Sequence, residues 1–348
     1  IIVCAKKNKD KNKIEKYGFK FYEISFNRKN INPFYELLIL IRIVIIYKKI
    51  LPDIVHHIAI KPIIYGSIAA KINNIRSVIN APVGMGYVFS SDSIKALVLR
   101  PIVSLLLKMF LNSHHGKGKK NKVIFENMDD LNSFVNIGAV IRKDTVLIRG
   151  AGVNVDKIFI NYKRNNPVPI VALVGRMLRD KGVYEFVNAA KILKKQNVSA
   201  KFLLVGDVDN FNSSSIQVEV LKNWHFEGLV DWLGMVNNVD EILKKVDILC
   251  LPSYREGLPK ALIEGAALGL PIVTTNTVGC RDVVEDQVNG FLVPVKDSLE
   301  LASSISRLIK DEKLRSKMGY ESFKIASTKF ASSIIIPQTL SIYKELNF

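Results

Sequence analysis

Two glutamates lie eight positions apart in the stretch E-G-L-P-K-A-L-I-E, which runs from Glu256 to Glu264. Carboxylates accept hydrogen bonds from neighbouring hydroxyl groups, so this pair could hold a sugar and a ribose. Gly257 would let backbone approach a ligand closely, and Pro259 suits the first turn of a helix, which places Glu256 in the preceding loop. A capping glutamate beside a surface glutamate and the carboxylate pair of a hydrolase are the alternatives. The apolar neighbours of Glu264 argue against a surface position for it.

A second loop, V-G-R-M-L-R-D-K-G, carries two cations between an expected strand and an expected helix. The strand ends at Gly175 and the helix begins near Gly182, so Arg176 and Lys181 lie on the loop at the carboxyl edge of the sheet. Such a loop and the helix N-terminus favour a phosphate, onto which Arg forks while Lys adds a point charge. A solvated basic loop is an equally weighted alternative.

The acidic pair Asp207 and Asp209 follows another expected strand. Two such carboxylates could hold a divalent cation or could form a turn. We favour the turn, because Arg176 and Lys181 would make a metal unnecessary for the charge of a diphosphate.

Adjacent histidines, His56 and His57, follow the strand-like run P-D-I-V. A histidine at the carboxyl end of a strand could transfer a proton or make a polar contact in a binding cleft. A satisfied structural histidine is the alternative, and the two are weighed equally, with His57 slightly ahead as the candidate.

Two glycines, Gly84 and Gly86, follow a further expected strand in the stretch P-V-G-M-G-Y. They would allow close backbone approach to a ligand, here assigned to the acceptor side. A plain turn is equally consistent with so short a motif.

The formal net charge is +18, which predicts an anionic partner. The basic stretch from His114 to Lys122 follows an amphipathic run, Lys95–Leu111, and such a combination can rest on an anionic membrane surface. A solvated loop is the commoner explanation of a charge run. Nucleic acid is disfavoured, because the basic stretch has no interleaved aromatic residues and no nucleic-acid-binding motif is present.

The length of 348 residues, with 48% hydrophobic residues, predicts two α/β domains with separate cores. Three widely spaced cysteines form neither a disulfide framework nor a zinc pattern, which fits a reducing, cytoplasmic setting. The longest apolar run, Leu37 to Ile46, is too short to span a bilayer and contains Arg42. The chain begins without Met inside a strand-like run, so we expect it to be truncated at its N-terminus.

Short apolar runs alternate with helical patterns along the chain, which predicts parallel sheets covered on both faces. The expected strands are 1–5, 20–25, 54–58, 75–80, 123–126, 145–149, 170–175, 201–206, 247–252, 271–275 and 290–295, and the expected helices are 33–50, 61–72, 93–111, 183–195, 214–224, 240–245, 259–268 and 298–310. The polar, Pro-containing stretch 161–169 suits a linker. We therefore predict domains at 1–160 and 161–334, and a final segment at 335–348.

Four motifs in this order resemble the family 4 retaining glycosyltransferases: G-R-x-x-x-x-K-G, P-S-Y-R-E-G-L-P-K-A-L-I-E, G-x-P-I-V-T-T and N-G-F-L-V-P. The resemblance covers nearly all of 169–330. It implies the GT-B fold, in which two Rossmann-like, doubly wound domains face each other across a cleft. The stretches H-H-I-A-I-K-P-I-I-Y-G, N-A-P-V-G-M-G-Y-V-F and I-R-G-A-G-V-N resemble bacterial members that build surface polysaccharides or glycans on undecaprenyl diphosphate.

The resemblance also implies roles for the residues in these motifs. Arg176 and Lys181 would bind the donor diphosphate and stabilise the leaving nucleotide, Glu256 would contact hydroxyls of the transferred sugar, and Glu264 would hold the ribose. The remaining donor-site residues are Gly175, Gly257, and the backbone of Leu258 and Pro259. Gly152 and His57 would face the cleft from the other domain, and a final helix around 339–346 would return to the first domain.

Three departures from the family pattern accompany the resemblance. The first strand and its Gly-rich loop would lie before Ile1. Asp282 stands where many relatives carry Glu, and some relatives place the cleft histidine where this chain has Ile60.

The implied function is transfer of an N-acetylhexosamine or a hexose from a UDP-sugar to a lipid-linked saccharide at the cytoplasmic face of the membrane. We expect fixed cations to stabilise the leaving group, with no metal, no other cofactor and no covalent protein nucleophile. A sugar-nucleotide epimerase or hydrolase of the same fold, and a non-catalytic sugar-nucleotide-binding protein, are the alternatives.

Overall fold

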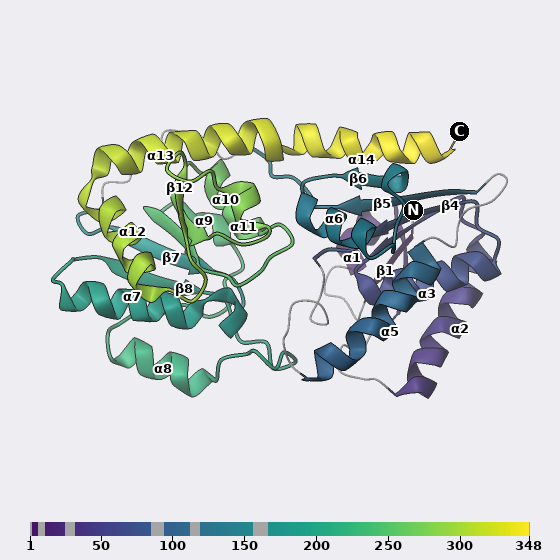
Figure 1. Ribbon diagram of the computed structural model, residues 1–348, viewed down its shortest axis with the longest axis horizontal. Helices are drawn as coiled ribbons and strands as arrows, with labels where there is room; N and C mark the ends of the chain where they lie inside the picture. The colour runs from purple at the N-terminus through teal and green to yellow at the C-terminus, as the bar shows by residue number, and fades with distance from the viewer. Residues whose placement is uncertain are drawn as a thin grey trace. The chain divides into compact units, whose positions relative to one another are not determined.

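The computed structural model describes residues 2–5, 11–24, 32–84, 94–111, 119–155 and 166–347 (Figure 1). The chain divides into two compact units. Unit 1 consists of Ile1–Phe125, Leu131–Val146 and Ile342–Phe348, and unit 2 of Glu126–Asp130 and Leu147–Ser341. Gly86, most of the basic stretch 114–122 and much of the expected linker 161–169 lie outside the described residues.

Unit 2 contains a six-stranded sheet in the order β12-β11-β10-β7-β8-β9, in which every neighbouring pair is parallel. Its strands are β7 (Ile170–Val174), β8 (Lys201–Val205), β9 (Asp231–Trp232), β10 (Ile248–Leu251), β11 (Ile272–Thr275) and β12 (Gly290–Val293). The strand order reverses between β7 and β10, which is the topological switch point of a doubly wound sheet. The prediction of a parallel, doubly wound domain in this half is confirmed.

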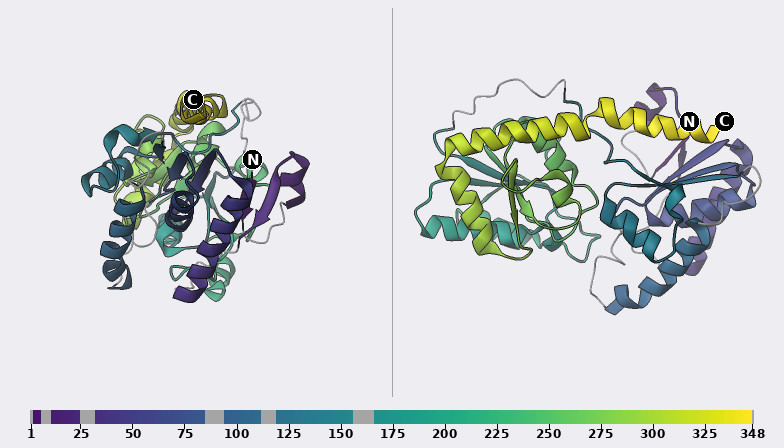
Figure 2. Two further views of the ribbon diagram at one scale, coloured as in Figure 1. Left: turned by 90° about the vertical axis from the view of Figure 1, so that its right-hand side faces the viewer. Right: turned by 45° about the horizontal axis from the view of Figure 1, so that its top comes forward.

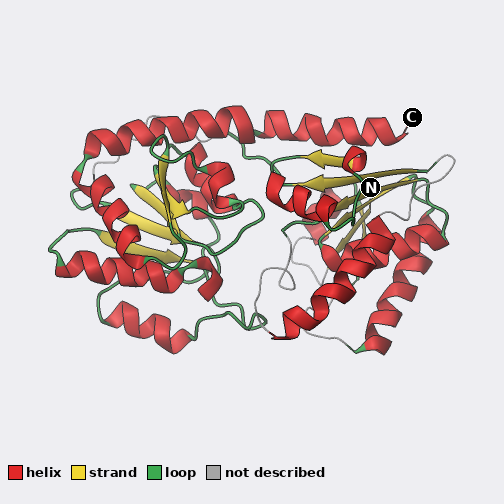
Figure 3. Ribbon diagram, viewed as in Figure 1, coloured by secondary structure: helices red, strands yellow, loops and turns green. Residues whose placement is uncertain are grey.

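Helices cover both faces of this sheet because its central strands have no polar face (Figure 3). The helices are α7 (Val183–Lys195), α8 (Val218–Phe226), α9 (Val239–Leu243), α10 (Lys260–Ala267), α11 (Cys280–Val283), α12 (Ser298–Lys310) and α13 (Glu312–Ile325). α7 packs against α12, and α13 packs against α10 and α12 (Figure 2). Asp297 begins α12 by accepting hydrogen bonds from two backbone N–H groups of its first turn.

Unit 1 contains a four-stranded sheet, β3-β4-β5-β6, and a parallel pair, β1-β2. The strands are β1 (Ile2–Ala5), β2 (Lys20–Glu23), β3 (Ile54–Ile58), β4 (Ser77–Ala81), β5 (Lys120–Phe125) and β6 (Thr145–Leu147). The helices are α1 (Lys11–Lys16), α2 (Pro33–Ile50), α3 (Ile60–Ile72), α5 (Ile94–Leu111) and most of α6 (Met128–Asn136). β4 pairs in parallel with both β3 and β5, and α3 packs against α2, α5 and β3.

The last helix, α14 (Ser332–Asn347), begins earlier than the sequence predicts. Its final residues belong to unit 1. There the Ser77 hydroxyl donates to the carbonyl of Leu346 over 2.9 Å, and the Lys122 ammonium lies 2.8 Å from the carboxylate of Glu345. These two contacts fix the end of α14 to β4 and β5.

The segment 147–155 belongs to unit 2, although the sequence places it before the predicted boundary at 160. The physical reason is a short parallel pairing. The backbone N–H of Val153 donates to the carbonyl of Phe330, and the N–H of Ser332 donates to the carbonyl of Val153, over 2.9 and 2.8 Å. No local pattern signals a pairing between positions so far apart in the sequence.

A glycine in α10 sets how closely this helix lies on the sheet. A Cβ atom on Gly265 would come within 2.2 Å of Cδ2 of the buried Leu249 on β10. We expect Gly265→Ala to lower the free energy of unfolding by about 1–2 kcal/mol, because overpacking outweighs the better helix propensity of Ala.

A double-mutant cycle checks this cause by chemical denaturation. Leu249→Ala alone should cost about 2–5 kcal/mol. The double variant should be more stable than the sum of the two losses predicts, because the methyl group then occupies vacated space. Strict additivity would contradict this account of the helix packing.

Candidate functional site

The two loops that the sequence singles out follow β7 and β10, the strands on either side of the switch point. One loop runs from Gly175 to Gly182 and the other from Pro252 to Pro259. Ligands of doubly wound sheets bind at this place, outside the carboxyl ends of the strands. The sheet topology therefore brings together two motifs that are about 80 residues apart in the sequence.

An ion pair joins the two loops. Nζ of Lys181 lies 2.5 Å from Oε1 of Glu256, and these side chains are only 21% and 11% exposed. The backbone supports the contact, because the carbonyl of Asp180 accepts hydrogen bonds from Tyr254 N and Ser253 Oγ over 2.8 and 2.9 Å. The structure thus brings these two predicted site residues into contact.

Gly182 makes the close approach of the loops possible. Its φ of +71° is in the left-handed region, and a Cβ atom on it would lie 2.0 Å from the carbonyl oxygen of Pro252. A side chain at this position would therefore force the loops apart. The glycine that ends the G-R-x-x-x-x-K-G motif is explained by packing as well as by turn geometry.

The other cation, Arg176, is half exposed and pairs with Asp209 over 2.6 Å. The same aspartate accepts a hydrogen bond from Phe211 N over 3.1 Å, and Asp207 accepts one from Val208 N over 2.8 Å. These contacts favour the turn interpretation of the acidic pair and add a counter-ion role for Asp209. Within the described ranges, no group of three or more His, Cys, Asp and Glu side chains could hold a metal ion.

The remaining donor-site candidates lie on or beside the loop after β10. Pro259 is the N-cap of α10, one position before the helix begins. Glu264 lies within α10 and pairs with Lys260 over 3.1 Å, and both belong to the helix. A Cβ atom on Gly175 would meet nothing within 4 Å, so there is open space beside this strand end. The side chain of Leu258 packs close to Gly150.

His57 has a buried, fully hydrogen-bonded environment in unit 1. It is 5% exposed; its Nδ1 lies 2.8 Å from Oδ1 of Asn80 and its Nε2 lies 2.9 Å from the hydroxyl of Tyr47. A Cβ atom on Gly66 would come within 2.3 Å of the ring. This geometry favours the structural-histidine interpretation over the catalytic one, because both ring nitrogens are occupied inside the core. The side chain points into the core, since the β3 residues alternate in direction.

Gly84 and Gly152 lie in different units. Gly84 has a φ of +67° in the turn after β4, which fits either interpretation of its motif. Gly152 belongs to unit 2, whereas the resemblance implied the other domain. Its φ is +78°, and a Cβ atom on it would lie 2.9 Å from the Cα atom of Ser332. Close packing against the start of α14 is therefore what this glycine provides.

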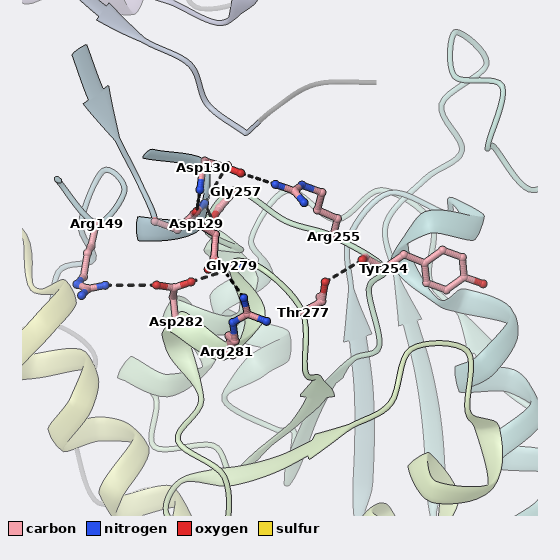
Figure 4. Close-up of polar contacts among 11 residues, drawn as sticks. Asp129, Asp130, Arg149, Tyr254, Arg255, Gly257, Thr277, Gly279, Arg281 and Asp282 are labelled. Carbon is pink, nitrogen blue, oxygen red and sulfur yellow. Dashed lines mark hydrogen bonds and ion pairs between the residues drawn. The ribbon is translucent and has the colours of Figure 1, made fainter. Parts of the chain in front are cut away.

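The segment Glu126–Asp130 is a part of the site that the sequence analysis missed (Figure 4). Asn127 donates from Nδ2 to the carbonyl oxygen of Gly257 over 2.8 Å, and Asp130 forms an ion pair with Arg255. The available signal was a helix start, since Asn127 accepts from the backbone N–H of Asp130 over 2.7 Å and caps α6. Nothing local to either stretch indicates that they meet.

Two further ion pairs lie beside this segment (Figure 4). Arg281 lies 2.8 Å from Asp129, and Arg149 lies 3.5 Å from Asp282. Asp282 also accepts a hydrogen bond from the N–H of Gly279 over 3.2 Å. The aspartate that departs from the family pattern thus serves as a helix cap and as a counter-ion.

Burial changes the ionisation of several groups in unit 2. Burial, and then repulsion from Asp130, raise the pKa of Glu126 to about 7, and its Oε2 has no hydrogen-bond partner among the described residues. Burial also raises the pKa of the Cys280 thiol to about 12, which keeps it in the unreactive neutral form. The pKa of Asp282 is raised by burial too.

Two family descriptions match this chain. Residues 154–325 match Glycosyl transferases group 1, and residues 1–113 match Glycosyl transferase 4-like. A relative from Campylobacter jejuni, N,N'-diacetylbacillosaminyl-diphospho-undecaprenol alpha-1,3-N-acetylgalactosaminyltransferase, is 28% identical over 99% of this chain and 90% of its own length. The UDP-Gal:alpha-D-GlcNAc-diphosphoundecaprenol alpha-1,3-galactosyltransferase of Escherichia coli is 28% identical over 82% of this chain and 74% of its own length.

Solved structures show the same fold. Anabaena HepE in complex with UDP-glucose is 18% identical, with a TM-score of 0.76 over 99% of this chain and 91% of its own. The sucrose-phosphate synthase of Thermosynechococcus elongatus is 20% identical, with a TM-score of 0.77 over 94% of this chain and 83% of its own. The GT-B prediction of two parallel-sheet α/β domains is confirmed.

The raised pKa of Glu126 predicts that stability depends on pH. Its pKa in the folded protein, about 7, lies above the ordinary pKa of a glutamate, 4.5, so the folded protein holds a proton that the unfolded chain releases. The free energy of unfolding should therefore fall by roughly 3 kcal/mol between about pH 4.5 and 7 through this group and change little further at higher pH.

Denaturation of Glu126→Gln at several pH values isolates this contribution. The variant keeps a neutral side chain at all pH values, so its stability should match the wild type at pH 4.5 and exceed it at pH 8. If the free energy of unfolding changed with pH equally in the wild type and the variant, the assignment to Glu126 would be disproved.

Proposed function

We propose, because this chain belongs to the glycosyltransferases described by the group 1 and 4-like families, that it moves a sugar from a UDP-sugar to an undecaprenyl-diphosphate-linked saccharide. The transferred sugar would be an N-acetylhexosamine or a hexose, and its anomeric configuration would be retained. The observation that carries the proposal is the near full-length similarity to the Campylobacter jejuni relative, whose name states such an acceptor. The galactosyltransferase of Escherichia coli and the UDP complexes of Anabaena HepE support the UDP-linked donor.

The loops at the switch point suit a nucleoside diphosphate. In this proposal Arg176 and Lys181 bind the diphosphate, and the N-terminus of α7 adds the positive end of its dipole. The developing charge on the leaving nucleotide is then stabilised by fixed cations without a metal. An ammonium group has three N–H donors, so Lys181 can keep its contact with Glu256 while it binds a phosphate oxygen.

Glu256 lies next to the cation that would hold the diphosphate. The sugar of the donor is attached to that diphosphate, so the second carboxylate oxygen is well placed to accept a hydrogen bond from a sugar hydroxyl. Glu264 lies further along the chain, within α10. It is proposed for the ribose, because it is partly exposed and its ion pair with Lys260 is a surface contact.

Two helices of unit 1 expose apolar side chains along one stripe each. On α2 these are Phe34, Leu37, Leu38, Ile41 and Ile45, which are 46–79% exposed, and on α5 they are Leu97, Val98, Ile102, Leu105 and Met109. Exposed cations flank the stripe of α2, at Arg42, Lys48 and Lys49. No helix among the described residues is both long enough and apolar enough to cross a bilayer.

We propose that these stripes rest on an anionic lipid surface. α2 and α5 both pack against α3, so the two stripes belong to neighbouring helices of unit 1. Apolar side chains would enter the headgroup region while the basic residues and the net charge of +18 attract anionic lipids. Such docking would bring the enzyme to an acceptor whose lipid stays in the membrane.

Substitution of the two cations tests the donor assignment. We expect Arg176→Ala and Lys181→Ala each to lower kcat/KM for the UDP-sugar about 100-fold or more, because each removes a fixed charge from the leaving group. Turnover would be measured with a panel of UDP-sugars and undecaprenyl-diphosphate-linked saccharide. Lys317→Ala, on the exposed side of α13, is the matched control and should retain wild-type rates.

Product analysis of the wild-type protein decides between the proposed activity and others of the same fold. The expected product is an extended lipid-linked saccharide with the anomeric configuration of the donor. Release of free sugar without acceptor, a changed sugar epimer, or UDP binding without any turnover would each overturn the proposal.

Vesicle binding tests the membrane proposal. We expect Leu38→Asp combined with Ile41→Asp to weaken co-sedimentation with phosphatidylglycerol-containing vesicles at least 10-fold, because burial of one large apolar side chain contributes about 1.5–3 kcal/mol. Phe226→Asp, on the exposed surface of unit 2, is the control and should bind as the wild type does. If the wild type bound purely zwitterionic vesicles equally well, attraction between the basic residues and anionic lipids would be ruled out as a cause of binding.

A further inference from the structure

We propose that Asn127 and Asp130 are positioning residues that hold the loop of Glu256 in the geometry needed for the sugar donor. They do so through the two neighbours of Glu256 in the sequence: Asn127 contacts Gly257, and Asp130 contacts Arg255. Figure 4 shows the pair of Asp130 and Arg255. The inference rests on the proposed function and extends it to a segment about 130 residues away in the sequence.

Asn127 is fully buried, and each polar group of its side chain has a partner. Its Nδ2 donates to the carbonyl oxygen of Gly257 over 2.8 Å and to Oδ2 of Asp130 over 3.0 Å, while its Oδ1 accepts from the N–H of Asp130 over 2.7 Å. The side chain therefore has one orientation. Because that orientation is fixed, the carbonyl group of Gly257 is fixed as well.

Asp130 contacts the residue that precedes Glu256, which is Arg255. Asp130 is 2% exposed and forms an ion pair with the guanidinium of Arg255, whose side chain is 29% exposed. A buried charge without its partner is strongly unfavourable, so this contact resists breaking. Asn127 and Asp130 are bonded to each other, which makes the pair a single rigid support for residues 255 and 257.

The loop is held from a second direction by the residues that follow β11. The N–H of Glu256 donates to the carbonyl of Val278 over 3.1 Å. A Cβ atom on Gly279, whose φ is +79°, would lie 2.6 Å from the carbonyl oxygen of Gly257 and 2.7 Å from that of Glu256. The backbone of Glu256 and Gly257 therefore lies between this glycine and the Asn127–Asp130 support.

The position of the Glu256 carboxylate follows from these backbone contacts. It meets Lys181 over 2.5 Å, and a bond so short depends on where the loop backbone lies. Catalytic groups must be held to within a fraction of an ångström, and a misplacement of about 1 Å can cost 100-fold in rate. Loosening either anchor should therefore act on the sugar contact before it acts on the fold.

The first test uses Asn127→Ser and Asp130→Asn. Serine keeps the cap of α6 but cannot reach Gly257, and the amide at position 130 keeps the shape but loses the ion pair. We expect kcat at saturating donor to fall on the order of 10- to 100-fold. UDP should bind within about threefold of the wild-type affinity, because Arg176 and Lys181 remain in place, whereas the preference for UDP-sugar over UDP should be lost.

The matched control is Asn289→Ser. Asn289 is also a fully buried asparagine of unit 2, and it accepts from the N–H of Glu285 over 2.8 Å and donates to Ser322 over 3.3 Å. It should lower the melting temperature as Asn127→Ser does and leave kcat and the donor preference unchanged. If the control lowers kcat in proportion to its stability loss, the positioning role is refuted.

A double-mutant cycle with Glu256→Gln identifies the residue through which the support acts. If Asp130 acts by placing Glu256, Asp130→Asn should add little to the loss of UDP-sugar affinity already caused by Glu256→Gln. Additive losses would overturn the inference. Arg255→Lys keeps a cation for Asp130 but lacks the planar guanidinium, and it replaces Asp130→Asn in the cycle if that variant does not fold.

Hydrogen exchange separates failure of this inference from failure of the proposed function. Amide protection of residues 255–258 should fall in Asn127→Ser and stay unchanged in Asn289→Ser, whether or not any donor is turned over. Unchanged protection in Asn127→Ser would refute the support itself. If protection falls in Asn127→Ser but the wild type transfers no sugar, the support stands and the proposed function is refuted instead.

Discussion

The ion pair between Lys181 and Glu256 is the contact on which the arrangement of the donor-binding unit depends. It joins the loop after β7 to the loop after β10, and these are the two strands between which the order of the sheet reverses. A glycine at position 182 is needed for the loops to come this close, and a backbone carbonyl at position 180 fixes their register. Backbone packing at the sheet edge therefore brings the loops together, and the ion pair holds the charged groups of the proposed donor site in place.

Unit 2 could be predicted well from the sequence because its signals are local. The ranges expected for α7 and α12 agree with the structure, since each helix has an apolar stripe of period 3.6 and a clear start, at Gly182 and Asp297 respectively. In unit 1, α2 also agrees with its predicted bounds, 33–50, and Asn32 and Pro33 mark its beginning in the structure. Strand positions followed from apolar runs ending in Gly, Pro or Ser.

The parts that the sequence did not predict depend on contacts between distant segments. Asn127 carries a capping signal that can be recognised, yet its bond to Gly257 cannot be inferred from either stretch alone. His57 was weighed as a cleft residue because strand ends often carry function, and its burial depends on Gly66, Tyr47 and Asn80 meeting around it. The helices α6 and α13 were missed for a simpler reason: their apolar positions are few, and their beginnings rest on single Asn and Asp caps.

The carboxylates beside the two donor-site cations have a consequence for which anions the protein admits. Arg176 has Asp209 and Lys181 has Glu256, so the site is close to neutral although the chain as a whole carries +18. A small anion such as inorganic phosphate gains little there, because it must compete with a carboxylate that is already in place and already desolvated. In the proposed function a diphosphate contacts both cations together. If the two cations bind a diphosphate as proposed, local charge compensation would favour the diphosphate over smaller anions at this site.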